Sequence, residues 1–348
     1  MKQETQVLHR SPGKFTSEVL GVGLDVGYGE LKGFRRGMKP VEEPAAVSEL
    51  SGTRGGWSEG EPNFALVEKE EGNRKRQFFV GNAALEYGDV RTGSVDSSYI
   101  TSEKYRVLGL YVLDRLAGKN PASLVTGLPV EFFAGKAGEL KQAIQGWHRY
   151  GFDIRGIEVL PQPIGALTDL GRDWDWNRLT DVDQEGRIGI VDIGRGTVDC
   201  IEANKGRMHP TIRGGRNEGV SMMHDELYQY LMKHKPDYMP ERSEIPGIMR
   251  AGGVEWYGEW VNLDKPITRI KKAFMERLVT IISEVWPRGT ARLRRIVFTG
   301  GGAAALEEYL REGHGKAFGP NQVLIPDNPV QANAIGFAKI ATIKARQG

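Results

Sequence analysis

Two short stretches of the sequence repeat the same arrangement of residue types. In each, an apolar run typical of a buried strand ends in Asp-x-Gly-x-Gly, first at Asp25 and again at Asp192. A glycine-rich turn can point successive backbone N–H groups at one anion. A carboxylate beside that anion requires a cation between them, and Mg²⁺ suits the position because it keeps most of its waters. The two motifs therefore predict two turns that hold a magnesium polyphosphate between them.

The repetition carries this inference, because a single Asp-x-Gly-x-Gly is more often an ordinary β-hairpin. The two aspartates lie about half the chain apart, which indicates two related domains rather than a solenoid. A third glycine element, VFTGGGA at 297–303, predicts a strand, a turn and a helix whose N-terminus faces a phosphate or ribose. A plain tight turn between strand and helix is the alternative there. The motifs of P-loop and dinucleotide-binding Rossmann domains are absent from the sequence.

Hydrophobic periodicity predicts the elements that position these turns. Both motifs are expected to join two strands, at 19–26 and 31–34 in the first copy and on either side of 194–197 in the second. A helix is expected from Ser102, its N-cap, and another from Asn328, with Pro329 at its first position. Further helices are predicted at 137–150, 164–170, 219–234 and 267–286, and a further strand at 154–160.

The length of 348 residues is enough for two domains. Residues 1–18 predict a flexible extension, 19–185 with 331–348 a first domain, and 186–330 a second. The polar stretch 172–187 is expected to be an exposed insertion at the boundary between them. Glycine is abundant, with 46 residues, which indicates many tight turns or close backbone approaches.

Composition excludes several classes of protein. A single cysteine rules out a disulfide framework and a cysteine zinc cluster. The 47 basic and 45 acidic residues nearly cancel, which excludes a general positive coat but not a local patch. The basic run at 288–295 is either a solvated face or a contact with a neighbouring subunit or DNA. No apolar run is long enough for a membrane span, and the polar N-terminus lacks the apolar core of a signal peptide.

Taken in order, the motifs resemble those of the actin–Hsp70–hexokinase superfamily, and within it the prokaryotic actins of the ParM type. LDVGYGELK is similar to the first phosphate motif, VLPQPIGAL to the first connecting motif and IVDIGRGTVDC to the second phosphate motif. TGGGAAALEEYL resembles the adenosine motif, while GLPVEFF and NPVQANAIGFAKI resemble ParM-type segments. The resemblance implies an α/β fold of two related ribonuclease-H-like, actin-like domains around a central nucleotide cleft.

The resemblance also implies roles for individual residues. Asp25 and Asp192 would hold a hydrated Mg²⁺, and Gln162 falls where relatives orient the attacking water. ParM-type proteins usually carry glutamate at that position, and a neutral amide aligns water without acting as a base, so hydrolysis should be slow. The phosphates and sugar of ATP or GTP would meet Gly27, Tyr28, Gly29, Gly194, Arg195, Gly196, Thr197, Gly300, Gly301 and Gly302.

The resemblance implies a cytoplasmic nucleotidase that assembles head to tail into filaments and segregates a plasmid or similar DNA. A separate adaptor would bind the DNA, with no direct sequence-specific DNA contact and no membrane partner. A small-molecule kinase of the same fold and a nucleotide-dependent scaffold with weak hydrolysis are the alternatives.

For four residues the sequence allows two interpretations each. Arg195 stands where relatives have a small residue, and either adds a cation to the phosphates or points to solvent. Lys32 either approaches phosphate or faces solvent from its strand. Trp256 and Trp260 are spaced one helical turn apart, which predicts packing in the core or at an interface.

Overall fold

The computed structural model describes residues 18–50, 62–68, 74–87, 98–179, 186–312 and 318–347. The expected flexible extension at 1–18 therefore lies outside the described residues except for Glu18. The domain boundary near 185 lies outside them too, so the proposed domain limits stay a prediction.

The first motif lies in a five-stranded sheet with the order β3-β2-β1-β7-β8. Strands β1 to β3 form an antiparallel meander, and β7 and β8 then pair in parallel beyond β1. The strands are β1 (Leu20–Val26), β2 (Glu30–Phe34), β3 (Val41–Pro44), β7 (Ala122–Leu128) and β8 (Ile154–Pro161).

The second motif lies in a five-stranded sheet with the same topology, in the order β11-β10-β9-β14-β15. Again three antiparallel strands are followed by two parallel ones. The strands are β9 (Arg187–Ile193), β10 (Val198–Asn204), β11 (Arg207–Arg216), β14 (Leu293–Thr299) and β15 (Val323–Leu324). The repeat in the sequence is thus a repeat of whole sheets, which confirms the predicted fold class.

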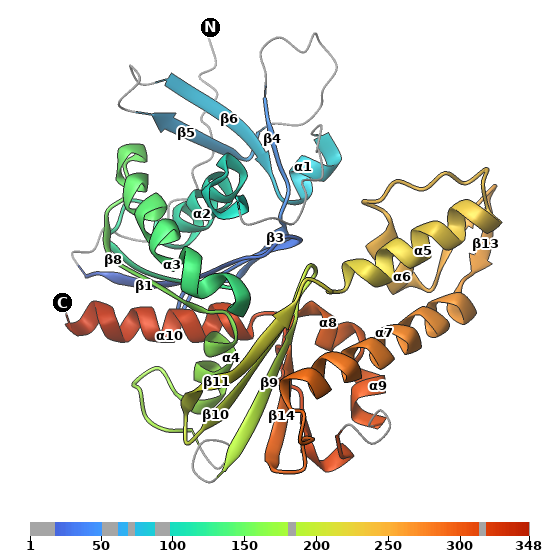
Figure 1. Cartoon of the computed structure of the whole chain (residues 1–348). Helices are drawn as coiled ribbons and strands as arrows, with labels where there is room; N and C mark the ends of the chain where they lie inside the picture. Colours follow the sequence, from blue (N-terminus) through green and yellow to red (C-terminus); the bar gives the residue numbers. More distant parts are fainter. Residues whose placement is uncertain are drawn as a thin grey trace, which may run out of the picture.

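Two helices pack on the sheet of the opposite half of the chain (Figure 1). Helix α4 (Pro163–Gly171) follows β8, yet its Ala166 and Leu167 pack with Ile190 and other residues of the second sheet. Helix α10 (Ala332–Gln347) comes last and packs on β1 and β7 of the first sheet. The two helices also contact each other, so they join the two domains at the base of the cleft.

The outer face of each sheet carries a separate hydrophobic core. On the first sheet the core includes helices α2 (Glu103–Leu116) and α3 (Val130–Gln145), the latter continuing into a 3₁₀ helix (Gly146–Tyr150). On the second sheet it includes α5 (Ser221–His234), α7 (Asp264–Val285) and α8 (Gly300–Ala305). Short helices complete the domains: α1 (Asn82–Tyr87), α6 (Ile245–Ala251), α9 (Glu307–Glu312) and 3₁₀ turns at Tyr99–Thr101 and Pro320–Gln322.

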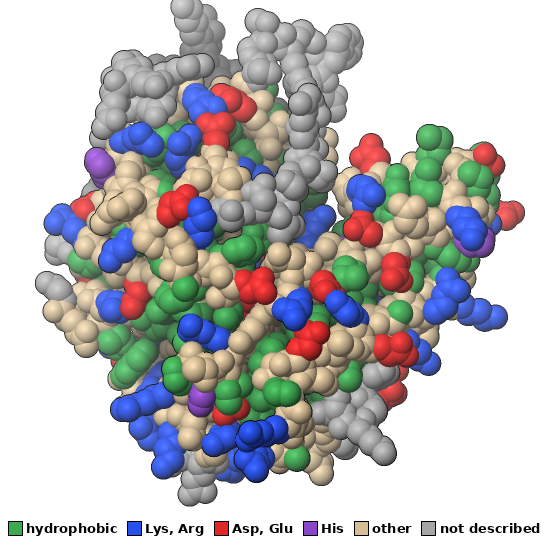
Figure 2. Space-filling view, in the orientation of Figure 1, with side chains coloured by type: hydrophobic (Ala, Val, Ile, Leu, Met, Phe, Trp, Pro, Cys, Tyr) green, Lys and Arg blue, Asp and Glu red, His purple; other side chains and the backbone are tan. Residues whose placement is uncertain are grey.

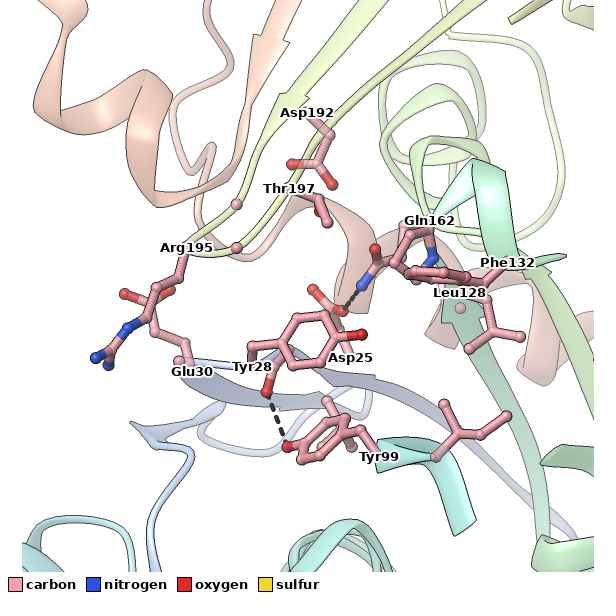
Figure 3. A pocket seen from close by; sticks show the side chains of 18 of the residues that line it. Asp25, Tyr28, Glu30, Tyr99, Leu128, Phe132, Gln162, Asp192, Arg195 and Thr197 are labelled. Carbon is pink, nitrogen blue, oxygen red and sulfur yellow. Dashed lines mark hydrogen bonds between the residues drawn. The ribbon is translucent and has the colours of Figure 1, made fainter. Parts of the chain in front are cut away.

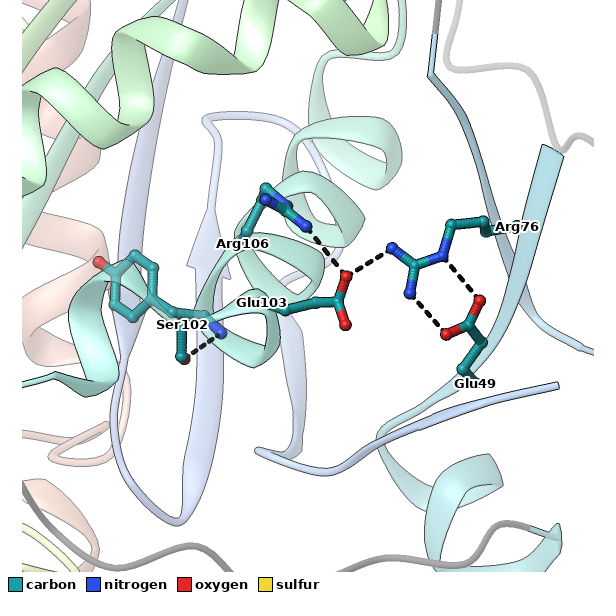
Figure 4. A network of polar contacts seen from close by, with 6 residues as sticks. Glu49, Arg76, Ser102, Glu103 and Arg106 are labelled. Carbon is teal, nitrogen blue, oxygen red and sulfur yellow. Dashed lines mark hydrogen bonds and ion pairs between the residues drawn. The ribbon is translucent and has the colours of Figure 1, made fainter. Parts of the chain in front are cut away.

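Each domain also has a small accessory sheet. The first domain has the order β4-β6-β5, from Val47–Glu49, Arg74–Val80 and Phe64–Glu68. Arg76 on β6 pairs with Glu49 on β4 and with Glu103 at the start of α2, so one side chain ties this sheet to the domain (Figure 4). The second domain has a hairpin of β12 (Gly253–Trp256) and β13 (Glu259–Asn262).

Several local predictions are confirmed and others are wrong. Ser102 caps α2 by accepting a hydrogen bond from the Tyr105 backbone N–H at 3.2 Å. Asn328 accepts from the Gln331 N–H, but a turn follows it and α10 begins only at Ala332. Helix α3 begins at Val130, seven residues before the predicted start, because its first turn follows Pro129 directly at the cleft.

The helical turn predicted from the spacing of Trp256 and Trp260 is wrong. They lie on the two strands of the β12–β13 hairpin, whose turn at Tyr257 and Gly258 has positive φ at both residues. None of the described helices is long and apolar enough to cross a bilayer.

Candidate functional site

The two glycine turns have the same local geometry. In the first, the Gly27 N–H donates to the Glu30 carbonyl at 2.9 Å, and in the second the Gly194 N–H donates to the Thr197 carbonyl at 2.8 Å. Each turn therefore closes one antiparallel hairpin at the carboxyl end of its first strand. Asp25 and Asp192 end up at equivalent places in the two sheets, which is why their spacing in the sequence predicted them together.

Both aspartates are buried in the cleft between the domains. Asp25 is 4 % exposed and Asp192 is 6 % exposed. Burial and the Asp25 carboxylate raise the pKa of Asp192. Burial disfavours the charged form of Asp192, and the nearby Asp25 carboxylate adds like-charge repulsion.

Gln162 meets the first aspartate directly. It stands at the end of β8, just before α4, and its Nε2 donates to Asp25 Oδ1 at 2.9 Å (Figure 3). The side chain is buried, so the amide is held at the cleft floor rather than exposed to solvent. The residue expected to orient water is thus in contact with a residue expected to hold the cation.

Two residues that the sequence analysis did not assign to the site donate hydrogen bonds to Asp192. Asn333 on α10 donates through Nδ2 to Asp192 Oδ2 at 2.7 Å, and Thr299 donates to Oδ1 at 3.3 Å. The Asn333 side-chain oxygen also accepts from the Ala166 N–H of α4. One amide therefore links both crossing helices to the second phosphate turn.

Lys32 lies inside the site, which decides between its two interpretations. It sits opposite Asp25 in the β1–β2 pairing and is 7 % exposed, with its Nζ 3.0 Å from Glu30. Burial alone would lower its pKa, but the carboxylates of Asp25, Glu30 and Asp192 together raise it. A permanent ammonium in this position offsets the negative charge of the cleft and can contact a phosphate oxygen.

Asp199 is the counterpart of Lys32 in the second hairpin, because it faces Asp192 as Lys32 faces Asp25. It accepts a hydrogen bond from the Val130 N–H at 2.7 Å, across the cleft at the start of α3. Burial raises its pKa to about 7, although the Val130 hydrogen bond works against that rise. Nothing but its place in the repeated motif could have marked this residue in the sequence.

A row of aromatic rings forms one wall of the cleft. The Tyr28 ring lies 4.9 Å from the Tyr99 ring, whose hydroxyl donates to the Gly27 carbonyl at 3.1 Å. Tyr99 in turn meets Tyr105 edge to face at 5.7 Å. The Tyr28 ring therefore packs against this row and lines the cavity together with Tyr99 and Tyr105.

The second turn lies against the first. A Cβ on Gly29 would stand 1.8 Å from Arg195 Cδ, so the Arg195 stem runs directly over the first glycine turn. Figure 3 shows Arg195 beside Glu30 at the mouth of the cavity. Arg195 is exposed as a residue but lines the cavity, so its guanidinium can reach an anion bound there.

Of the third glycine element, Gly300 lines the cavity. Gly300 has φ +84° and a Cβ there would stand 2.5 Å from the Ile193 carbonyl, so only glycine fits. It borders the cavity, whereas Gly301 and Gly302 do not. Gly302 instead packs under Ile193, where a Cβ would clash at 2.1 Å.

The structure brings nearly all the predicted site residues to one cavity between the domains (Figure 3). Its lining includes Asp25, Gly27, Tyr28, Gly29, Gln162, Asp192, Gly194, Arg195, Gly196, Thr197 and Gly300.

The residues present suit a hydrated divalent cation. Burial and the Asp25 carboxylate raise the pKa of Asp192, so a cation between the two carboxylates would be favoured. Among the described residues no three His, Cys, Asp or Glu side chains gather as a complete metal site. Asp25 and Asp192 would hold Mg²⁺ through water, and the cation would neutralise phosphate charge.

Comparisons with known proteins agree with this geometry. The family described as the N-terminal domain of actin-like proteins matches residues 23–165, and the C-terminal domain of archaeal MreB-like actin homologues matches 190–312. No curated protein matches the chain by sequence.

Among solved structures, a 15-stranded ParM filament from Clostridium botulinum shares 20% identity over 95% of this chain and 100% of its own, with a TM-score of 0.74. The archaeal actin homologue Ta0583 in complex with ADP shares 16% identity over 93% of this chain and 99% of its own, with a TM-score of 0.66. Two matched halves, a duplicated sheet and facing phosphate turns lead to one conclusion: this chain belongs to the actin-like proteins, with the fold of the ParM filament proteins.

Proposed function

We propose that this protein binds ATP or GTP with Mg²⁺ in the cleft, closes its two domains around it and assembles head to tail into a filament. The observation that carries the proposal is the pair of equivalent turns, with Asp25 and Asp192 facing each other and Lys32 buried beside them. Backbone N–H groups from both turns would contact the phosphates, so the nucleotide would hold the two domains together.

Closure gives a physical route to assembly. A head-to-tail contact pairs two different surfaces of the protein, and it propagates as a helix unless the rotation closes a ring. If the closed state forms this contact better, nucleotide binding favours the filament by its differential affinity for that state. Hydrolysis would then weaken the contact and make the filament unstable.

Hydrolysis is proposed to be slow, with Gln162 aligning the attacking water. Its carboxamide cannot remove a proton at neutral pH, and its Nε2 is already committed to Asp25, which leaves Oε1 to accept from the water. The same contact favours the second candidate, a nucleotide-dependent scaffold with little turnover. The rate of phosphate release distinguishes these two functions.

The proposed test measures sedimentation and phosphate release with ATP·Mg²⁺ and GTP·Mg²⁺ over a range of protein concentrations. The parent protein should pellet with nucleotide, and Asp192→Ala should lose both pelleting and phosphate release. Asp237→Ala, an exposed aspartate on the second domain, is the matched control and should behave like the parent.

Three outcomes would contradict parts of the proposal. No pelleting at any concentration removes the filament, and release that requires an added hydroxyl compound identifies a kinase instead. Parent-like release by Asp192→Ala shows that the site is misassigned.

The cellular role proposed for such a filament is the segregation of a plasmid or similar DNA in the cytoplasm, through an adaptor. Loss of a plasmid carrying the gene for this chain should increase when Asp192→Ala replaces the parent. Equal retention of both plasmids would count against this role.

A further inference from the structure

The second sheet has a strongly basic end, opposite the end that carries the phosphate turn. The strand pairing aligns Arg187 with Leu293 on one side and with Asn204 on the other, and Asn204 pairs with Arg207. The starts of β9, β11 and β14 and the turn after β10 therefore form one row across four neighbouring strands. Adjacent strands lie about 4.8 Å apart, so cations on this row are spaced over roughly 15 Å.

Six exposed cations occupy this row and the loop beside it, and we call them the basic edge. Figure 2 shows Lys and Arg side chains gathered at the bottom of the molecule, where these strands end. The basic edge consists of Arg187, Lys205, Arg207, Arg288, Arg292 and Arg294.

Acidic side chains are nearly absent from the same segments. Across 186–189, 202–209 and 286–295 the single acidic residue is Glu202, which is 2 % exposed. It accepts a hydrogen bond from the Trp286 indole at 3.1 Å and lies 3.7 Å from Arg187. Among the described residues of these segments the charge is therefore positive, in contrast to the formal net charge of +2 for the whole chain.

The basic edge is too far from the nucleotide cleft to serve it. Strand β9 runs from Arg187 at the basic edge to Ile193 beside the second glycine turn, and seven residues at about 3.3 Å each span roughly 20 Å. None of the six cations lines the cavity between the domains. Their clustering needs an explanation other than the bound nucleotide.

We propose that the basic edge binds the phosphodiester backbone of double-stranded DNA, without regard to base sequence. Five of the six cations are arginines, whose planar fork donates two hydrogen bonds to one phosphate. A row of cations along a sheet end suits a continuous polyanion better than a small one, which requires an enclosed site. Such a contact would hold DNA beside the protein without the sequence recognition expected of an adaptor.

An acidic protein surface is the competing occupant, and the apolar content of the edge argues against it. None of the large hydrophobic side chains exposed in the described structure falls within the three segments. Protein interfaces are enriched in aromatic anchors at their centres, whereas DNA interfaces are polar, wet and positively charged. The basic edge has the polar, positively charged composition of a DNA interface.

The test is fluorescence anisotropy of a labelled 30-base-pair duplex of arbitrary sequence, titrated with the full-length protein in the absence of nucleotide. Binding to backbone phosphates should give a dissociation constant of about 1–100 µM near physiological salt, unchanged by a second, unrelated duplex. The logarithm of the association constant should fall linearly with the logarithm of salt concentration. Segment 180–185 lies outside the described residues and carries three acidic residues, so the full-length chain measures the edge with those charges in place.

The discriminating variant is Arg288→Gln/Arg292→Gln, two exposed arginines of the edge. Removing two phosphate contacts should reduce the salt slope by about 1.8 and weaken binding about tenfold or more. Lys39→Gln/Lys119→Gln removes the same charge from exposed positions of the first domain and should bind like the parent. A circular dichroism melt of each variant confirms that the fold is kept.

Two results would overturn the proposal: a parent protein that does not bind the duplex below 1 mM, or equal weakening by both double variants. If the duplex is not bound but Arg288→Gln/Arg292→Gln alters sedimentation with nucleotide, the edge contacts another copy of this chain instead. Because the anisotropy assay omits nucleotide, its outcome is independent of filament formation and hydrolysis, and either proposal can fail alone.

Discussion

At the scale of single residues, the two hairpins have the same residue at the end of the first strand but different residues opposite it. An aspartate ends the first strand in both, but the residue opposite is Lys32 in one hairpin and Asp199 in the other. The cleft therefore combines a buried ammonium from the first domain with a buried carboxyl from the second. The two domains therefore line the cleft with different groups, a permanent cation from the first and a carboxyl whose pKa is about 7 from the second.

Replacing Gln162 with alanine should slow phosphate release at least tenfold while nucleotide binding changes less than twofold. The reason is that Gln162 donates to Asp25 and, in the proposed mechanism, aligns the attacking water, which alanine cannot do. Single-turnover release with saturating ATP·Mg²⁺, together with titration of a fluorescent nucleotide, separates these effects. Gln142→Ala, an exposed position on α3, serves as the control, and equal rates for both variants would remove Gln162 from the mechanism.

Replacing Asp199 with asparagine should change how stability depends on pH. The folded protein holds the Asp199 proton up to about pH 7, whereas the unfolded chain loses it near pH 4, so this group makes the free energy of unfolding fall between those values. Asp199→Asn lacks that fall and keeps an oxygen to accept from Val130. The variant should gain stability relative to the parent as pH rises from 5 to 8, by at most about 3 kcal/mol, because about two pKa units of the difference fall in that window.

Urea unfolding of both proteins without nucleotide, at steps from pH 5 to pH 8, measures this difference. Burial and the nearby Arg195 lower the pKa of His224 to about 4, which gives the opposite slope on the acidic side. That contribution is present in both proteins and cancels in the comparison. Parallel curves would show that Asp199 carries no proton at neutral pH.

At the scale of elements, Arg76 tests how the accessory sheet is attached to the first domain. Its guanidinium makes two hydrogen bonds to Glu49, at 2.7 and 2.5 Å, and a third to Glu103 at 2.5 Å (Figure 4). Bidentate, networked pairs are stronger than isolated surface pairs. Arg76→Gln should lower the free energy of unfolding by about 1–2 kcal/mol.

Denaturant titration at low salt and at 0.5 M NaCl checks this prediction, because screening should reduce the difference. Lys75→Gln, at the exposed neighbouring position on β6, should cost less than about 0.5 kcal/mol. A loss that is the same for both variants would mean that the network does not hold the sheet.

At the scale of the whole molecule, the crossing of α4 and α10 controls how the domains are joined. A Cβ on Gly336 would stand 1.8 Å from the Gly165 carbonyl, so the two helix backbones touch at a pair of glycines. Gly165 is three residues from Gln162, and Asn333 is three residues from Gly336. Any separation of the helices therefore moves residues that contact both aspartates.

Gly336→Ala should lower the free energy of unfolding by about 3 kcal/mol or more, because backbone rather than a flexible side chain must move. Phosphate release should fall with it. Gly138→Ala, on α3 with open space around it, should instead be neutral or stabilising by up to about 1 kcal/mol. Chemical unfolding of the two variants under the same conditions decides whether the crossing is as tight as the structure shows.

The sequence by itself determined the fold class, the two glycine turns and about half of the cavity lining. The conformation of an Asp-x-Gly-x-Gly turn depends on residues that are adjacent in the sequence. Its repetition half a chain later indicated that the domain is duplicated. The helix cap at Ser102 is local in the same way. Trp256 and Trp260 show the limit, because a spacing of four residues fits both a helical turn and a short hairpin.

Only the tertiary structure decided which residues meet across the repeat. Asn333 reaches Asp192 and Lys32 turns inward because α10 and β2 pack where they do, and neither contact leaves a local pattern in the sequence. The same holds for the basic edge, whose arginines come from three separate segments. Strand pairing brings them into one row, because a sheet aligns strand ends that are far apart in the chain.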